Sequence, residues 1–181
     1  MAISLAFDKH QADARKEWLS RYRKDACVDH TKKHLGYKEF VEKELVHFSI
    51  ADNTRSIPSL VDGMKPGQRK ILFAMFKRLN AGAKKLTNDI KVAQLAGYVA
   101  EHSAYHHGEA SLQMTIVNMA QDFMGTNNIN LLAPVGQFGT RMVGGKDFAS
   151  ARYIFSNLME ATRQLYHEED GPILDYIKEE G

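Results

Sequence analysis

The fold of this chain is decided by the stretch KVAQLAGYVAEHSAYHHGEASLQMTIVNMAQDF, residues 91–123. Apolar residues recur there at helical spacing and predict one helix over about 91–104 and a second over about 109–123. The turn HHG, residues 106–108, interrupts the pattern. Two helices joined by a short glycine-containing turn, after an earlier helix, are typical of a helix-turn-helix unit. The second helix offers core positions at Ala110, Met114, Val117, Met119, Ala120 and Phe123.

Upstream of this pair the sequence predicts further helices separated by breaks. Residues 8–24 are polar and helix-prone, and residues 37–48 show a short amphipathic pattern that the sequence SIPS at 56–59 breaks. Pro66 suits the first position of another helix, because its missing N–H is not needed there. That helix would bury one stripe, made of Ile71, Leu72, Met75, Phe76 and Leu79. A polar loop without periodicity follows at 80–89.

Downstream the pattern changes to turns, glycines and short strands. Residues 131–132 and 152–155 are strand candidates, and a long glycine-rich excursion separates them. A hairpin-like loop after a helix-turn-helix is a wing. A last helix over about 157–166 precedes an acidic tail. We therefore expect a mainly α chain with a small β wing, an α+β winged-helix domain with flanking helical segments.

Composition indicates a soluble globular chain, with 44% hydrophobic and 25% charged residues. No apolar run approaches the roughly 20 residues of a membrane helix, and the N-terminus lacks the pattern of a secretory signal. Cys27 is the only cysteine, so an internal disulfide is impossible, and we expect it to be small and partly buried. The single thiol fits a reducing, intracellular compartment.

Charge is unevenly distributed although the net charge is only +2. Between Lys65 and Lys91 eight basic residues stand against one acid, whereas from Glu160 onward seven acids stand against two basic residues. A basic middle segment fits a face that binds a polyanion, and it equally fits a solvated helix face.

Tyr153 is the candidate nucleophile. A free phenol ionises near about pH 10, so a reactive tyrosine needs a base or local positive charge, and attack on a phosphodiester also needs cations at the phosphate oxygens. Arg152 adjoins Tyr153, and the preceding loop holds Gln137, Arg141 and Lys146. In a regular strand Arg152 and Tyr153 would point to opposite faces, so the chain must bend for both to reach one phosphate. The alternative is an aromatic strand residue packed in a core.

Two further groups are candidates for phosphate contacts. His106 and His107 precede a helix N-terminus, which favours anions, although turn histidines without a role fit as well. Lys65, Arg69 and Lys70 begin the basic helix, where a solubilising face is the alternative. The sequence contains no Asp-x-Asp cluster, no set of acids at metal-ligand spacing and no Walker loop, so it predicts no metal cage and no ATP site in this chain.

Five segments together resemble the type IIA DNA topoisomerases, in their eukaryotic or large-DNA-virus branch. They are SIPSLVDGMKPGQRK (56–70), KVAQLAG (91–97), YHHGE (105–109), GQFGTR (136–141) and ARYIF (151–155).

The resemblance implies roles for individual residues. Tyr153 would attack the DNA backbone and become linked to a 5′ phosphate, with Arg152 stabilising the scissile phosphate. Residues matching positions that hold the cleaved strand are Arg55, Lys70 and His107. Further contacts to double-stranded DNA would come from Lys65, Arg69, His106, Gln137 and Arg141. The runner-up hypothesis is a winged-helix DNA-binding module without chemistry.

The resemblance also implies partners and boundaries. Mg²⁺ would be bound by a TOPRIM domain outside this chain, ATP would act only in the full enzyme, and the full enzyme would be a homodimer, nuclear or in a viral factory. Residues 1–35 would be a connector from TOPRIM, 36–168 the winged-helix DNA-gate domain, and 169–181 the start of a linker to a tower domain. We expect no strand passage by this chain alone. Two departures are a long loop at 79–89 and Ala151 in place of proline.

Overall fold

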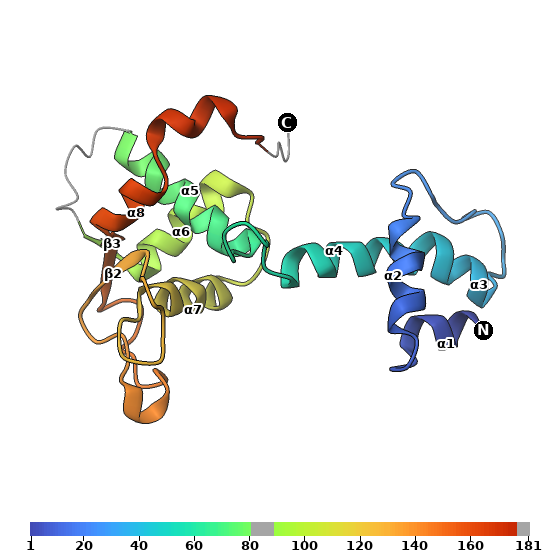
Figure 1. The fold of residues 1–181 in the computed structure, drawn as a ribbon, viewed down its shortest axis with the longest axis horizontal. Coiled ribbons are helices and arrows are strands. Elements are labelled where there is room, and N and C mark those ends of the chain that lie inside the picture. The colour runs from blue at the N-terminus through green and yellow to red at the C-terminus, as the bar shows by residue number, and fades with distance from the viewer. Residues whose placement is uncertain (81–88, 177–181) are drawn as a thin grey trace. The chain divides into compact units, whose positions relative to one another are not determined.

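A computed structural model of the chain describes residues 1–80 and 89–176. It contains two compact units, Met1–Lys65 and Pro66–Gly181, which are described separately below (Figure 1). This division falls inside the range 36–168 that the sequence assigns to one domain. In the described ranges, no helix has both the length and the apolar character to cross a membrane.

The first unit is helical. It consists of α1 (Ala2–Phe7), α2 (Ala12–Ser20) and a long helix that begins as α3 (Tyr37–Phe40), passes through a π-helical turn at Val41–Leu45 and continues as α4 (Val46–Ser56). This helix runs eight residues further than the predicted 37–48, and it ends where the sequence SIPS begins. Val28, Val41 and Val46 are buried in the unit. Cys27 is exposed, whereas partial burial was expected.

The second unit is built on three helices, α5 (Pro66–Asn80), α6 (Val92–Ser103) and α7 (Glu109–Ala120). Helix α5 begins at Pro66, as predicted. Fully buried side chains from all three helices form the core, among them Ile71, Met75, Leu95, Val99, Ile116 and Val117. Phe76 and Leu79 are only partly buried. Residues 81–88, which hold most of the predicted long loop, lie outside the described residues.

The core face of α7 differs from the predicted one. Leu112 and Ile116 are buried, together with Val117, Met119 and Ala120, whereas Ala110 and Met114 are exposed. The buried positions follow a spacing of three to four residues, so they share one side of the helix, and Ala110 and Met114 fall on the other side.

A three-stranded antiparallel sheet adjoins these helices, in the order β1-β3-β2. Its strands are β1 (Ile90–Lys91), β2 (Leu132–Val135) and β3 (Phe155–Leu158). Phe155 is paired with Lys91 on one side and Val135 on the other. The order helix, strand, helix, helix, strand, loop, strand confirms the predicted α+β winged-helix arrangement. The loop between β2 and β3, residues 136–154, is called the wing below (Figure 1).

The strand predicted at 152–155 begins later, at Phe155, and residues 151–153 form a turn. Similarly, the last helix begins at Glu160 (α8, Glu160–Leu165) and not near residue 157, because Asn157 and Leu158 pair with β2. Backbone pairing therefore shifted both boundaries by about three residues, within the usual error of sequence-based boundaries.

Candidate active site

The turn that carries Tyr153 is fixed to the start of α6. The Ala93 N–H donates to the Ala151 carbonyl at 3.0 Å, and the Val92 N–H donates to the Ile154 carbonyl at 3.0 Å. The Tyr153 N–H closes the turn on the Ser150 carbonyl at 2.8 Å. The first N–H groups of a helix have no acceptor within the helix, so these carbonyls satisfy them and hold the turn in place.

Neighbouring residues of this turn have opposite environments. The Ile154 side chain is 1% exposed and anchors the turn in the core, whereas Tyr153 is 77% exposed. Tyr153 is therefore not the core aromatic of a strand. The bend that the chemistry requires is present, because Arg152 and Tyr153 are both exposed on the turn instead of alternating along a strand.

Arg152 lines a shallow pocket between the turn and the first two helical positions of α7. The other lining residues are Ala93, Glu109, Ala110, Gln113, Ser150 and Ala151. The Glu109 carboxylate accepts a hydrogen bond from the Gln113 side chain at 2.7 Å. The structure thus brings Arg152 next to the N-terminal end of α7.

Lys70 holds the turn between α6 and α7. Its Nζ donates to the Ala104 carbonyl at 3.0 Å. Ala104 has a left-handed backbone, with φ of 47°, and caps the C-terminus of α6. A lysine ammonium is a favourable partner for carbonyls at a helix C-terminus. Lys70 therefore acts on the segment that carries the two candidate histidines.

His106 and His107 are exposed in this turn, directly before α7. The His107 ring meets Tyr105 edge-on, with centroids 5.3 Å apart. Helix α7 begins after Gly108 without a side-chain cap, and the N-terminus of a helix generally favours an anion. Lys70, the histidines and Arg152 accordingly gather around one end of α7.

The wing carries Gln137 and Arg141, both exposed. The Gln137 carbonyl accepts from the Ala149 N–H at 2.9 Å, and Arg141 begins a 3₁₀ turn, Arg141–Val143. Asp147 clamps the wing by accepting from the backbone N–H of Thr140 at 2.7 Å and from its hydroxyl at 2.8 Å. These two bonds lower the pKa of the Asp147 carboxyl below its ordinary value.

Sequence reasoning missed Gln121, a buried side chain that bonds to the wing backbone. A single glutamine at the end of a helix has no periodic signature, and only the position of the distant wing shows its partners.

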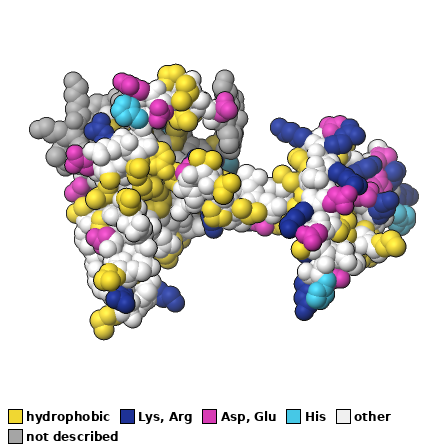
Figure 2. All heavy atoms as spheres, in the orientation of Figure 1, with side chains coloured by type: hydrophobic (Ala, Val, Ile, Leu, Met, Phe, Trp, Pro, Cys, Tyr) yellow, Lys and Arg dark blue, Asp and Glu magenta, His cyan; other side chains and the backbone are white. Residues whose placement is uncertain are grey.

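Arg69 lies in the first turn of α5 in the second unit and is exposed. Arg55 and Lys65 belong to the first unit and are described within it alone. Arg55 forms an exposed ion pair with Asp52 at 2.7 Å on α4. Oppositely charged side chains are interspersed over this unit (Figure 2), which fits its several exposed ion pairs, including Lys16 with Asp13 and Arg23 with Asp25. Such pairs contribute little to stability.

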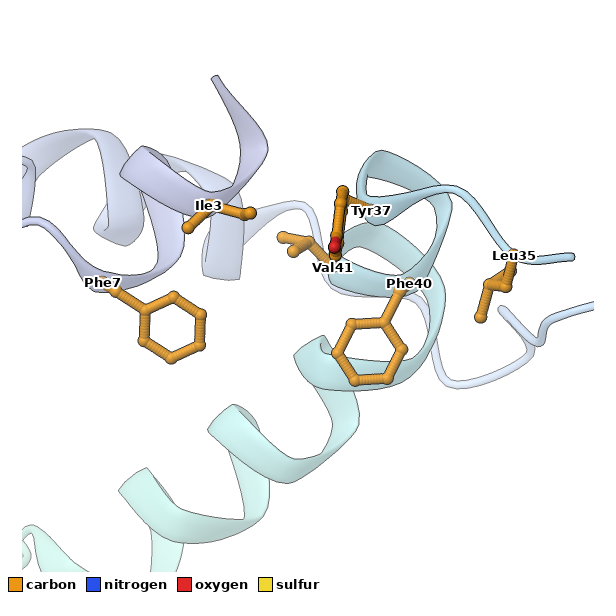
Figure 3. Close-up of a pocket in the computed structure, with 6 residues that line it drawn as sticks. All are labelled: Ile3, Phe7, Leu35, Tyr37, Phe40 and Val41. Carbon is orange, nitrogen blue, oxygen red and sulfur yellow. The ribbon is translucent and has the colours of Figure 1, made fainter.

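The first unit also has an apolar pocket between α1 and the start of the long helix (Figure 3). Its lining residues are Ile3, Phe7, Leu35, Tyr37, Phe40 and Val41. The lining contains no charged side chain, so it offers neither a phosphate site nor acid–base chemistry. Across residues 1–80 and 89–176 no group of three or more His, Cys, Asp or Glu residues is placed to hold a metal ion.

These features define a winged-helix domain with an exposed tyrosine on a fixed turn beside an arginine. The family model for the A subunit of DNA gyrase/topoisomerase IV matches residues 55–181, and that of the C-terminal associated domain of TOPRIM matches residues 1–53. The chain belongs to the type IIA DNA topoisomerase family.

The relatives place it near the eukaryotic members. It is 55% identical to DNA topoisomerase 2 of Plasmodium falciparum (isolate K1 / Thailand) and 57% identical to that of Arabidopsis thaliana, over 99% of this chain and 12% of each relative. It is 53% identical to DNA topoisomerase 2 of Saccharomyces cerevisiae over 98% of this chain and 12% of the relative. The chain thus spans about an eighth of the length of these relatives.

A solved structure matches as well. The Plasmodium falciparum topoisomerase II DNA-binding, cleavage and re-ligation domain superposes with a TM-score of 0.81 at 55% identity, covering 99% of this chain and 24% of that one. The resemblance drawn from the five sequence segments is confirmed at the level of the family.

Proposed function

We propose that this chain is the DNA-binding and strand-cleaving part of an ATP-dependent type II DNA topoisomerase, with Tyr153 as the nucleophile. The observation that carries the proposal is the exposed Tyr153 side chain on a turn that two backbone hydrogen bonds fix to α6. A phenol exposed on a turn that is hydrogen-bonded to a helix is accessible for attack, and a fixed position lowers the entropic cost of orienting it.

The reaction is a transesterification. The Tyr153 phenol oxygen attacks a backbone phosphorus, the new O–P bond forms as the bond from phosphorus to O3′ breaks, and the phenol loses its proton to a base or solvent. The O3′ leaves as a hydroxyl after taking up a proton, and the tyrosine holds the 5′ phosphate. Attack by the same O3′ on the tyrosine-linked phosphorus reverses every step. The phosphotyrosyl ester therefore keeps the 5′ phosphate ready for resealing the strand.

The residues around the N-terminal end of α7 would bind the DNA backbone. In this proposal Arg152 neutralises charge on the scissile phosphate, His106 and His107 donate to neighbouring phosphates, and Gln137 and Arg141 contact DNA from the wing. Further proposed contacts to the DNA backbone are Lys65, Arg69, Lys70 and Arg55. Phosphate contacts of this kind give affinity without sequence readout.

The proposal places the other components outside this chain. In this proposal Mg²⁺ is bound by a TOPRIM domain outside this chain, and the described residues contain no group of three or more His, Cys, Asp or Glu placed to hold a metal ion. ATP would act in the full enzyme, which would be a homodimer working in the nucleus. The TOPRIM connector would be residues 1–35, the DNA-gate domain residues 36–168, and the start of the tower linker residues 169–181. The match of residues 1–53 to the C-terminal associated domain of TOPRIM supports a TOPRIM connection at the N-terminal end of the chain, and it extends past residue 35.

A covalent-trapping assay tests the proposal. The chain is mixed with end-labelled nicked DNA and Mg²⁺, with and without a separately expressed TOPRIM-bearing chain, and run on denaturing gels. We expect a labelled adduct of the 20.4 kDa chain that requires the second chain and is absent for Tyr153→Phe. DNA binding without any adduct would instead identify a non-catalytic winged-helix module.

A further inference from the structure

Gln121 joins the end of α7 to both limbs of the wing. It occupies the C-cap of α7, its side chain is 7% exposed, and its Nε2 donates to the Phe138 carbonyl at 2.9 Å and to the Gly145 carbonyl at 3.0 Å. Both amide protons therefore have an acceptor, one on each limb of the wing.

The wing backbone approaches this amide more closely than any side chain would allow. A Cβ atom added at Gly145 would lie 2.4 Å from the Gln121 Nε2, and one added at Gly139 would lie 2.5 Å from the Gly145 carbonyl oxygen. Phe138, whose carbonyl accepts from the Gln121 amide, is 3% exposed. The two limbs and the helix end thus form one packed junction.

The junction leads directly to the tyrosine turn. After Gly145, which Gln121 holds, the returning limb is held at Asp147 by Thr140 and at Ala149 by the Gln137 carbonyl. The turn that carries Tyr153 begins at the next residue, Ser150. Movement at Gly145 would therefore be transmitted along a short, hydrogen-bonded segment to the nucleophile.

We propose that Gln121 is a positioning residue, which fixes the wing on α7 so that Tyr153 and the wing side chains keep their places for cleavage. The inference rests on the proposed function, because it names a residue that holds the wing backbone leading into the cleavage turn. The amide serves this role at position 121 because it donates two hydrogen bonds without carrying a charge. A glutamate of the same shape would place a carboxylate against two carbonyl oxygens, and a methionine would fill the space without donating.

The test compares Gln121→Glu and Gln121→Met with a matched control, Gln164→Glu, which makes the same change at an exposed position of α8. The rate of adduct formation at saturating DNA and the DNA concentration for half-saturation are measured in the trapping assay. We expect both Gln121 variants to slow the rate on the order of 10- to 100-fold. The half-saturating concentration should change by less than about threefold, because most of the proposed phosphate contacts lie outside the wing.

Hydrogen exchange provides a second readout that does not depend on cleavage. The Gly145 and Ala149 N–H groups bond to Thr140 and Gln137 across the wing, and their exchange should accelerate about tenfold or more in both Gln121 variants. The amides of α6 and α5 should keep their protection in all proteins, which shows that the variants are folded. Gln164→Glu should match the wild type in every measurement.

The outcomes separate this inference from the proposed function. If the wild-type chain forms no adduct, the proposed cleavage fails, and exchange alone decides whether Gln121 fixes the wing. If adducts form and the Gln121 variants match the wild-type rate, the positioning role is overturned even where exchange accelerates. Unchanged exchange in both variants would overturn it as well.

Discussion

At the scale of single residues, the contrast between Tyr153 and Ile154 defines the site. One side chain is exposed and the next is buried, because the turn presents them to opposite environments. Sequence reasoning predicted Tyr153 as the nucleophile, which stays a prediction, and it predicted the need for a bend. It could not place the bend, because the two hydrogen bonds that create it come from α6, about sixty residues earlier in the chain.

Replacing Tyr153 by phenylalanine should remove the chemistry and nothing else. The side chain is 77% exposed, so we expect the free energy of unfolding to stay within about 0.5 kcal/mol of the wild-type value. The DNA dissociation constant should change by no more than about twofold, since phosphate contacts dominate affinity. Chemical denaturation and DNA titration check both values, and a large loss of either would show that the ring has a structural role.

The Asp147 clamp should make the wing sensitive to acid. Hydrogen bonds from the Thr140 N–H and hydroxyl lower the pKa of Asp147 in the folded protein. A lowered folded pKa means that this stabilisation is present above the unfolded value of about 3.9 and disappears as the pH falls through the lower folded value. We expect protection of the Gly145 amide to be constant near neutral pH and to fall below about pH 4.

The control for this pH dependence is Asp147→Asn. The amide side chain cannot change charge, so the acid-induced loss of protection at Gly145 should be absent, after correction for intrinsic exchange. A variant that still loses protection in the same pH range would assign the effect to another group.

At the scale of elements, the regular parts of the fold were predictable and the boundaries were not. The periodicity of residues 91–123 predicted α6 and α7, and Pro66 marked the start of α5. The core face of α7 was partly wrong, because Ala110 and Met114 are apolar but exposed. The start of β3 was wrong by three residues, because strand pairing with β1 and β2 is a long-range property.

The wing depends on close backbone contact at one glycine more than at its neighbours. Gly139 and Gly144 both have positive φ, 102° and 62°, but only Gly139 lies against other backbone, whereas a Cβ at Gly144 meets open space. We expect Gly144→Ala to cost about 1–2 kcal/mol of wing stability from strain alone. Gly139→Ala should cost more, about 3–5 kcal/mol of wing stability in total, because backbone atoms must move.

Exchange protection of the wing amides measures this difference, and the adduct rate reports its effect on cleavage. Gly144→Ala is the matched control, since it makes the same substitution at a left-handed position of the same loop. Equal losses in the two variants would show that φ strain, and not the close approach, governs the wing.

At the scale of the whole molecule, two compact units suggest separate unfolding. The single tryptophan, Trp18, lies on α2 of the first unit and reports that unit alone, whereas circular dichroism reports the helices of both. Ile154→Ala removes a buried side chain from the second unit and should destabilise it by about 2–5 kcal/mol.

We therefore expect Ile154→Ala to shift part of the circular dichroism transition while the midpoint from Trp18 fluorescence stays at its wild-type value. A matched change in the first unit, Val46→Ala, should shift the fluorescence midpoint instead. Shifts of both probes by either variant would show that the units unfold as one.

The way the turn is attached to α6 also bears on how freely its sequence can vary. Residue 151 contributes its carbonyl to the Ala93 N–H, and every amino acid, proline included, carries a backbone carbonyl. Alanine can therefore stand where the resemblance leads one to expect proline without losing the acceptor. The turn is attached through backbone atoms, so the side chain at position 151 can change while the tyrosine keeps its orientation.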